Sequence, residues 1–234
     1  MKVLILAGGK GTRLQALVAD RPKPMALVGG RPFLAFLLDR LNDAGLLDVT
    51  LSVGYKADVI RQYFGTHYRN IALRYEEETT PLGTGGAIGR ALAGQGSTPW
   101  LVLNGDTFFE LDYRQFIACW RKRPTHMAVA VTMVDDGERY GGVVVQDGML
   151  IGFVEKKMAG RTLINAGGYI LTECDLLPYA LPQQYSFETD FLQPQCKALL
   201  PSAFGSSGYF IDIGVPDDLA RAQSNGRFAQ KLLP

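Results

Sequence analysis

Residues Lys2–Leu14 read KVLILAGGKGTRL, and this stretch decides the fold. The first part, Lys2–Ala7, is rich in valine, isoleucine and leucine, as is typical of a strand buried on both faces. Glycines follow at once, so the backbone can approach a ligand closely and direct N–H groups at an anion. The GxxxxGK[ST] pattern of a Walker A loop is absent, and a GxGxxG fingerprint fits weakly because Leu14 stands where its last glycine or alanine belongs. An ordinary turn remains the alternative.

Short apolar runs alternate with helical patterns through the first half of the chain. The expected elements are strand Lys2–Ala7, helix Phe33–Ala44 closed by Gly45, strand Val49–Val53, helix Asp58–Phe64, strand Ile71–Tyr75, helix Thr84–Ala93 and strand Trp100–Asn104. This alternation predicts a Rossmann-like α/β fold whose mixed, mostly parallel sheet has helices on both faces. Ligands in such sheets bind at the carboxyl ends of the strands.

The second half is richer in strands. Asp147-Gly148 lies between Gly141–Val145 and Leu150–Glu155, which is a strong hairpin signal. Further elements are strand Ile164–Leu171, a helix near Glu188–Leu199 and strand Tyr209–Ile213. No linker, repeat or low-complexity tract separates the halves. We therefore expect one domain over residues 1–234, with an α/β half to about 110 and a β-rich lobe from about 111.

Composition excludes several classes of protein. The 24 lysines and arginines balance 23 acidic residues, so the net charge of +1 predicts no nucleic-acid partner. No apolar run reaches the roughly 20 residues that span a bilayer, which predicts no membrane partner. Cys119, Cys174 and Cys196 are odd in number and far apart, so they form neither a disulfide framework nor a metal knuckle. A cytoplasmic location is expected.

The glycine loop and six downstream segments resemble the sugar-1-phosphate nucleotidyltransferases. The matching segments follow one another in the family's order and are Leu6–Leu14, Pro22–Met25, Pro81–Ala87, Asn104–Asp106, Phe153–Lys156, Asn165–Gly167 and Asp212–Gly214. Within this family, Ser52–Lys56 and Asn104–Phe109 most resemble the D-glycero-α-D-manno-heptose 1-phosphate guanylyltransferases. The resemblance implies a GT-A-like fold, with nucleotide bound by residues 1–110 and sugar phosphate by residues 111–234.

The implied reaction is attack by a sugar 1-phosphate oxygen on the α-phosphorus of a nucleoside triphosphate, with release of pyrophosphate. The closer resemblance implies GTP, a heptose 1-phosphate and a nucleotide sugar for cell-surface glycans. One alternative is UTP with another hexose 1-phosphate. Another is a catalytically silent nucleotide-sugar-binding subunit, but such a subunit is expected to have lost the family's charged residues, whereas Arg13, Lys23, Asp106 and Asp212 are all present. Monomer and homodimer both remain open.

This reaction requires positively charged groups in the site, because both of its substrates are polyanions. The resemblance implies that Arg13 binds the leaving pyrophosphate with its planar guanidinium and that Lys23 neutralises the α-phosphate region. It also implies that Lys156 holds the sugar phosphate while Glu155 accepts from sugar hydroxyls. An exposed ion pair is the alternative for these last two. The divalent cation, Mg²⁺ or Mn²⁺, would be held by Asp106 and Asp212, although either could be a turn residue.

The remaining expected contacts fall into two groups. The nucleotide-binding set is Leu6, Ala7, Gly8, Gly9, Gly11, Thr12, Arg13, Glu78, Gly83 and Thr84. The sugar-binding set is Gly105, Glu155, Lys156, Asn165 and Gly167, with Glu188 and Asp190 as weaker candidates that equally suit a helix N-terminus.

The prediction that the nucleotide base is guanine rests on Glu78. A carboxylate can accept two parallel hydrogen bonds, and guanine offers two adjacent donors where uracil offers one donor between two carbonyls. A solvated acidic loop over Glu76–Glu78 is the alternative.

Overall fold

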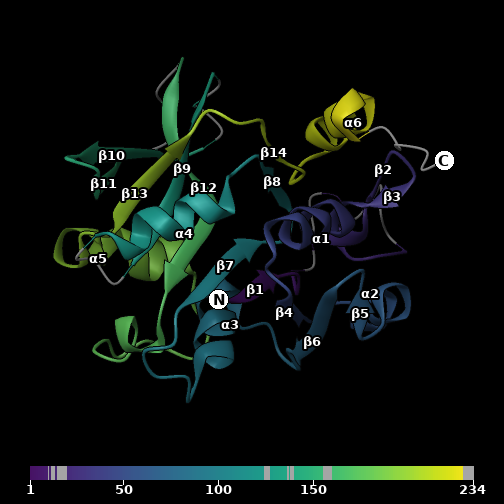
Figure 1. Ribbon diagram of the computed structural model, residues 1–234, viewed down its shortest axis with the longest axis horizontal. Helices are drawn as coiled ribbons and strands as arrows, with labels where there is room; N and C mark the ends of the chain where they lie inside the picture. Colours follow the sequence, from purple (N-terminus) through teal and green to yellow (C-terminus); the bar gives the residue numbers. More distant parts are fainter. Residues whose placement is uncertain are drawn as a thin grey trace. The chain divides into compact units, whose positions relative to one another are not determined.

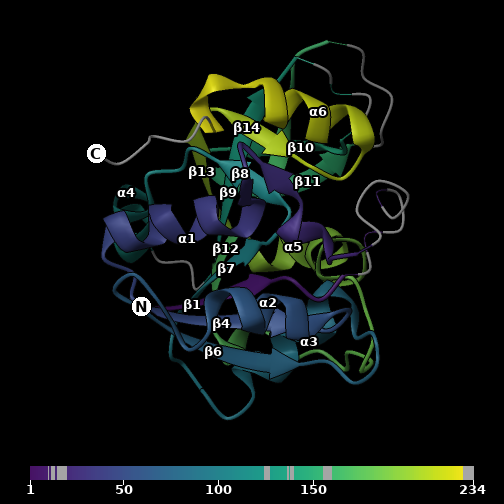
Figure 2. The same ribbon diagram turned by 90° about the vertical axis from the view of Figure 1, so that its right-hand side faces the viewer.

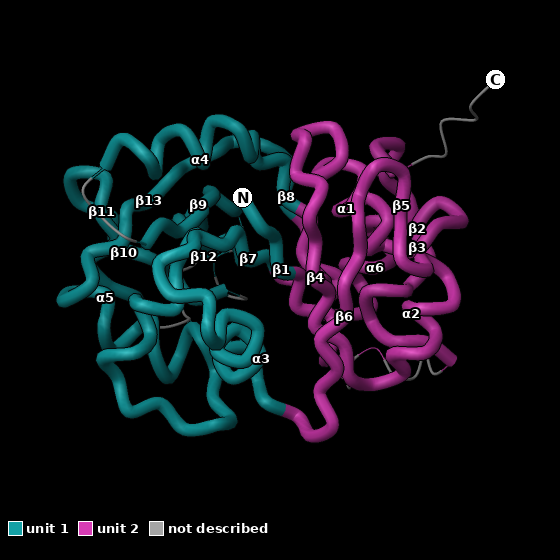
Figure 3. The backbone as a smooth tube through the Cα atoms, turned by 60° about the horizontal axis from the view of Figure 1, so that its bottom comes forward, with its two compact units in different colours: residues 1–4, 82–103, 109–210 teal, residues 5–81, 104–108, 211–234 magenta. Residues whose placement is uncertain are grey.

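The computed structural model describes residues 1–9, 11, 14, 20–123, 127–135, 137, 140–154 and 160–228. The chain divides into two compact units, each assembled from separated segments (Figure 3). Unit 1 comprises residues 1–4, 82–103 and 109–210, and unit 2 comprises residues 5–81, 104–108 and 211–234. No helix in the described part of the chain is long and apolar enough to cross a membrane.

Unit 2 contains the strand–helix alternation expected from the sequence (Figures 1 and 2). Strand β1 (Lys2–Leu6) leads from unit 1 into unit 2, where the elements are η1 (Lys23–Met25), β2 (Leu27–Val28), β3 (Arg31–Pro32), α1 (Phe33–Ala44), β4 (Asp48–Val53), α2 (Ala57–Phe64), β5 (His67–Tyr68) and β6 (Ile71–Glu77). The strand order is β1-β4-β6-β5, with β4 parallel to β6 and β5 antiparallel to β6. Helix α1 ends at Gly45 with φ of 75°, as its sequence predicts.

The C-terminal segment completes the core of unit 2. Helix α6 (Pro216–Ser224) is followed by η5 (Gly226–Phe228). The buried ring of Phe228 lies edge-on to the rings of Phe36 and Phe108, with each pair of centroids 5.0 Å apart. Such aromatic pairs contribute beyond the area that they bury. Residues from both ends of the chain therefore share one core.

Unit 1 is the β-rich part. Its elements are α3 (Gly83–Leu92), β7 (Trp100–Asn104), β8 (Thr107–Phe109), α4 (Tyr113–Arg121), β9 (Ala128–Val134), β10 (Gly142–Gln146), β11 (Met149–Val154), β12 (Thr162–Leu171), η3 (Glu173–Asp175), the π-helix η4 (Phe187–Leu192), α5 (Gln193–Leu199), β13 (Ser202–Ser206) and β14 (Phe210–Asp212). The strand order is β10-β11-β13-β9-β12-β7, and β14 pairs with β8 separately. Strand β7 passes into unit 2 at Asn104, whereas only Phe109 of β8 and Phe210 of β14 belong to unit 1 and the rest of these two strands belongs to unit 2.

Both parallel and antiparallel pairs occur, so the mixed α/β class is confirmed. Strand β13 is parallel to β9, whereas β12 pairs antiparallel with both β7 and β9. The hairpin predicted at Asp147-Gly148 joins β10 to β11, and both turn residues have positive φ. The sequence patterns did not predict α4 or β13, and they indicated only the start of β9, near His126. A continuous apolar run such as AVAVTMV in β9 fits a buried helix as well as a strand.

Three glycines at the start of α3 let this helix pack closely against one segment of unit 1. An added Cβ would lie 2.4 Å from the Tyr185 carbonyl oxygen at Gly83, 2.2 Å from the Gln183 carbonyl oxygen at Gly86, and 2.0 Å from the Tyr185 ring at Gly85. The N–H of Gly85 also donates to the Tyr185 carbonyl oxygen at 3.0 Å. The Pro81–Ala87 segment, which resembles a ligand-binding motif of the family, thus also packs against Gln183 and Tyr185 inside unit 1.

We predict opposite effects on stability for two alanine substitutions in α3. Gly85→Ala should lower the free energy of unfolding by about 1–3 kcal/mol, because its methyl group has to displace the buried Tyr185 ring. Gly89→Ala should raise it by up to about 1 kcal/mol, because the nearest atom of Tyr185 is 3.8 Å away and alanine favours the helix. Urea unfolding of both variants measures the difference. Equal effects would contradict the packing role of Gly85.

Candidate functional site

Backbone hydrogen bonds join three segments of unit 2 at the carboxyl end of β1, namely the glycine loop, the end of β4 and the turn after β7. The N–H of Ala7 donates to the Ser52 carbonyl oxygen at 2.8 Å, and the N–H of Gly105 donates to the Leu6 carbonyl oxygen at 2.9 Å. An added Cβ on Gly105 would lie 2.6 Å from that same Leu6 oxygen, so a glycine is needed there. The loop that carries Asp106 is thereby held against the start of the glycine loop.

Lys23, Asp106 and Asp212 form an ionic cluster in unit 2, although 83 and 189 residues separate the lysine from its two partners. Nζ of Lys23 lies 2.6 Å from Oδ2 of Asp106 and 3.4 Å from Oδ1 of Asp212. The side chains are 13%, 35% and 33% exposed, in that order. The N–H of Ile213 donates to the Asp106 carbonyl oxygen at 3.0 Å, which fixes the two acidic segments side by side.

The electrostatics of this cluster favour an additional cation. Burial by itself lowers the pKa of Lys23, but the carboxylates of Asp106 and Asp212 outweigh it and the pKa is raised. Burial raises the pKa of Asp212, and the charge of Asp106 raises it further, while Lys23 acts in the opposite direction. Within the described residues, one ammonium therefore faces two carboxylates and compensates the second of them only partly.

The carboxylates suit a divalent cation that also binds phosphate. Carboxylate oxygens are hard ligands of the kind that Mg²⁺ prefers, and a single ammonium already bridges the pair. An added Cβ on Gly214 would come within 3.0 Å of Asp212 Oδ1 and 3.2 Å of Lys23 Nζ, so the glycine leaves space beside the cluster. Among the described residues no group of three or more His, Cys, Asp or Glu side chains could hold a metal. Phosphate and water would therefore supply the remaining ligands.

Glu78 lies against the glycine loop instead of extending into solvent as part of an acidic run. Its Oε1 accepts a hydrogen bond from Ser52 Oγ at 2.8 Å, and an added Cβ on Gly8 would lie 2.7 Å from the same oxygen. Its neighbour Glu77 forms an ion pair with Arg61 at 2.9 Å. The two adjacent glutamates thus have different surroundings, and of the two it is Glu78 that lies beside Gly8 of the glycine loop.

A polar group in unit 1 includes two of the predicted sugar contacts. The Asn165 amide nitrogen donates to Tyr169 Oη at 2.7 Å and to a carboxylate oxygen of Glu188, while its Oδ1 accepts from the Gly167 N–H at 3.1 Å. The amide is therefore held in one orientation by three partners. Glu188, a weaker candidate from the sequence, lies with Asn165. Asp190 instead accepts from the Ser186 N–H at 2.7 Å, as expected at a helix start.

The other predicted residues are placed as follows. The Thr84 hydroxyl oxygen accepts from the Phe187 N–H at 2.9 Å, so it and Gly83 take part in packing within unit 1. The carbonyl oxygen of Gly8 accepts from Tyr55 N–H at 3.3 Å, whereas at Gly9 no atom of a described residue other than its chain neighbours lies within 4 Å of an added Cβ. Thr12, Arg13, Glu155 and Lys156 lie outside the described residues.

Three residues of these groups were not among the predicted contacts. Ser52 orients Glu78, Tyr169 accepts from Asn165, and Gly214 leaves space beside the Lys23 cluster. Ser52 and Gly214 fall inside segments that carry the family resemblance, so the signal for both was present. Tyr169 lies in an apolar strand, where a tyrosine is usually a core residue.

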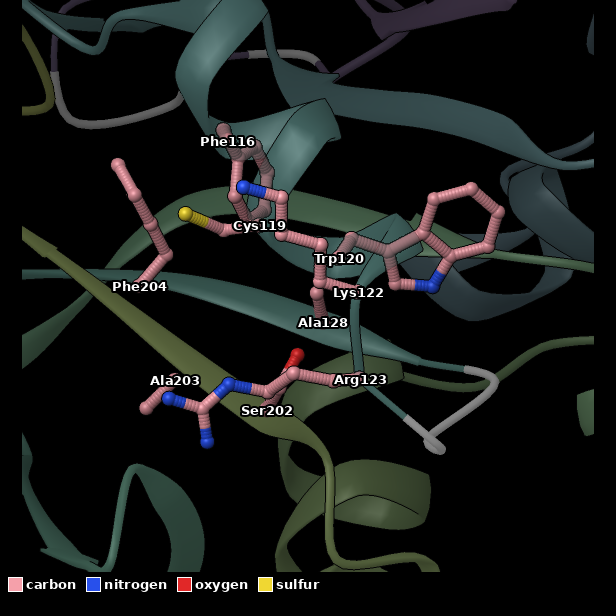
Figure 4. Close-up of a pocket in the computed structure, with 9 residues that line it drawn as sticks. All are labelled: Phe116, Cys119, Trp120, Lys122, Arg123, Ala128, Ser202, Ala203 and Phe204. Carbon is pink, nitrogen blue, oxygen red and sulfur yellow. The ribbon is translucent and has the colours of Figure 1, made fainter.

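A cavity of about 300 Å³ in unit 1 is a separate feature (Figure 4). Phe116 and Trp120 of α4 line it together with Phe204 of β13, and Lys122 and Arg123 provide its positive charge. The Arg123 guanidinium already donates to the Gly148 carbonyl oxygen at 3.3 Å. None of the predicted site residues that the structure describes lines this cavity, which is therefore distinct from the candidate site.

Comparison with known proteins identifies similar chains along nearly the full length. The sequence family described as Nucleotidyl transferase matches residues 2–227. The chain is 39% identical to D-glycero-alpha-D-manno-heptose 1-phosphate guanylyltransferase of Aneurinibacillus thermoaerophilus, covering 95% of this chain and 97% of that protein. It is 41% identical to the protein of the same name from Campylobacter jejuni, covering 93% and 96%.

Solved structures agree with the sequence comparison. The crystal structure of HddC from Yersinia pseudotuberculosis complexed with GMP-PN superimposes with a TM-score of 0.83 at 39% identity. The match covers 95% of this chain and 97% of that chain.

Proposed function

Because the chain belongs to the nucleotidyl transferase family, we propose that it transfers GMP from GTP to D-glycero-α-D-manno-heptose 1-phosphate. A phosphate oxygen of the sugar attacks the α-phosphorus, the bond to the β-phosphate breaks, and pyrophosphate leaves. The product is a nucleotide sugar for cell-surface glycans. The three cysteines are free in the structure, which fits a reaction in the reducing cytoplasm.

The Asp106–Lys23–Asp212 cluster carries the catalytic part of this proposal. A phosphate-transfer site has to neutralise two polyanions, and this cluster combines an ammonium with the two carboxylates that would hold Mg²⁺. The cation, when bound, lowers the negative charge of the phosphates. Arg13 would bind the leaving pyrophosphate, and no general base is required because the attacking phosphate oxygen is already anionic.

The sugar phosphate is assigned to residues of the second half of the chain and to Gly105. Lys156 would bind the phosphate and Glu155 the sugar hydroxyls. The Asn165 side chain and the Gly167 backbone would add contacts to hydroxyls, supported by the three hydrogen bonds that fix the Asn165 amide. We add Glu188 to this set, because its carboxylate lies on the same amide.

Glu78 is our candidate for base recognition. Its contacts with Ser52 and Gly8 support a fixed carboxylate beside the glycine loop. The names of the two curated relatives and the GMP-PN bound to HddC support guanine as the base.

A pyrophosphate-release assay tests the function as a whole. The four nucleoside triphosphates are each combined with a panel of sugar 1-phosphates that includes the heptose and mannose compounds. We expect the highest kcat/KM for GTP with the heptose 1-phosphate and no turnover in EDTA. Preference for UTP or for another hexose 1-phosphate would overturn the substrate assignment, and absence of turnover with every pair would overturn the activity.

Substitution of either aspartate tests the divalent cation site. Asp106→Asn and Asp212→Asn should each lower kcat by about 100-fold or more, because the amide removes a charge from the Mg²⁺ ligands. Asp217→Asn is the matched control, since Asp217 is an exposed residue in the first turn of α6. Steady-state rates at saturating Mg²⁺ give the comparison, with circular dichroism as a check on folding. Near-normal turnover in both site variants would rule out the assignment.

Substitution of Glu78 tests base recognition. Glu78→Gln should lower kcat/KM for GTP about tenfold or more and narrow the preference for GTP over UTP, because the amide offers only one acceptor to the two guanine donors. Glu77→Gln removes the same charge one residue earlier and should keep the wild-type ratio. If Glu78→Gln also keeps that ratio, Glu78 does not recognise the base.

A further inference from the structure

Lys23 occupies the position that a divalent cation needs. Its Nζ contacts Oδ2 of Asp106 at 2.6 Å and Oδ1 of Asp212 at 3.4 Å, so both oxygens face one point. Mg²⁺ binds oxygen at about 2.0–2.1 Å. An ammonium and a divalent ion on the same two oxygens would repel each other strongly, because their separation would be only a few ångströms. The two cations therefore exclude each other from this pair of oxygens.

The backbone of Lys23 is fixed, whereas its ammonium is carried on a flexible stem. Residue 23 begins η1, where Met25 N–H donates to the Pro22 carbonyl oxygen at 2.8 Å and Ala26 N–H to that of Lys23 at 3.0 Å. Gly11, with φ of 59°, packs so closely that an added Cβ would lie 2.8 Å from Lys23 Cβ. Beyond Cβ, the remaining methylene groups can rotate. The ammonium can thus leave the carboxylates without movement of the backbone.

We propose that Lys23 is an internal competitor for the divalent cation. Its ammonium partly compensates the charges of Asp106 and Asp212 in the metal-free protein, and it turns to the phosphates of the nucleotide when the cation binds the carboxylates. The second step rests on the proposed function, because the triphosphate is the anion that receives the displaced ammonium. Metal binding is consequently weak without nucleotide, and by linkage the nucleotide and the metal strengthen each other's binding.

The alternative to this competition is that Lys23 keeps its ion pairs when the metal binds. In that case the metal would use Oδ1 of Asp106, which accepts from Thr107 Oγ1 at 3.3 Å, and Oδ2 of Asp212. Removal of the lysine charge would then improve metal binding little or not at all. The two arrangements differ in the affinity of the nucleotide-free protein for a metal ion, which can be measured without any catalytic assay.

The test uses Lys23→Met, which keeps most of the side-chain volume and removes the charge. Binding of Mn²⁺ alone is followed by the electron paramagnetic resonance signal of the free ion. We expect Lys23→Met to bind Mn²⁺ about tenfold more tightly than the wild type. Lys197→Met removes the same charge from an exposed position on α5 and should bind like the wild type. Adding Asp106→Asn to Lys23→Met should abolish the tight binding.

Thermal unfolding provides a second readout that does not depend on Mn²⁺. In EDTA, Lys23→Met should unfold at a lower temperature than the wild type, because two neighbouring carboxylates have lost their shared cation. Added Mg²⁺ should raise the unfolding temperature of Lys23→Met more than that of the wild type. Lys197→Met again serves as the control and should show the wild-type increase.

Equal Mn²⁺ affinity in the wild type and Lys23→Met would overturn the competition, as would an equal increase in unfolding temperature with Mg²⁺. The pyrophosphate-release assay distinguishes this failure from failure of the proposed function. Activity on GTP with equal Mn²⁺ affinities would mean that the function holds and the competition does not. If Lys23→Met binds Mn²⁺ more tightly than the wild type but the wild type shows no activity with any substrate pair, the competition holds and the proposed function does not.

Discussion

The attraction between one ammonium and two carboxylates holds the candidate site together. Asp106 and Asp212 would repel each other in a partly buried corner if Lys23 did not lie between them. Breaking such a group by removing one partner costs more than the group contributes in total, because an unpaired charge is left in low dielectric. Charge therefore fixes η1 to the loop after β7 and to the end of β14, and a backbone hydrogen bond from Ile213 to Asp106 joins the last two segments as well.

Local sequence patterns predicted the elements whose signals are complete within a few residues. Helix α1 has apolar residues at helical spacing and a glycine cap, and the β10–β11 hairpin has its Asp147-Gly148 turn. Helix α4 was not predicted, although Asp112 caps it by accepting from Gln115 N–H at 2.9 Å. The division of the chain into interleaved units has no local signal.

The candidate site was predicted residue by residue only through resemblance. Nothing near Lys23 in the sequence indicates that it meets Asp106 and Asp212, because those contacts depend on how distant segments fold. The structure adds what resemblance did not predict, namely that Ser52 orients Glu78 and that Gly214 keeps space beside the cluster. It also gives Gly83 and Thr84 a packing role, since both contact the 185–187 segment of unit 1. The glycine-rich motif at the start of α3 thus allows this helix to pack closely on the 183–187 segment, independently of any ligand that the motif binds.

The interleaving of the two units has a consequence for how the protein is synthesised. Unit 2 begins near residue 5, yet it takes Asp212 and the Phe228 ring from the last part of the chain. A ribosome-bound chain that has emerged only as far as β6 lacks both carboxylates of the Lys23 cluster and the Phe228 ring of the aromatic core. The core of unit 2 therefore stays incompletely packed until residues 82–210, which are mostly unit 1, have been synthesised. Chaperone contacts during that interval are to be expected at the face of α1 that Phe228 later covers.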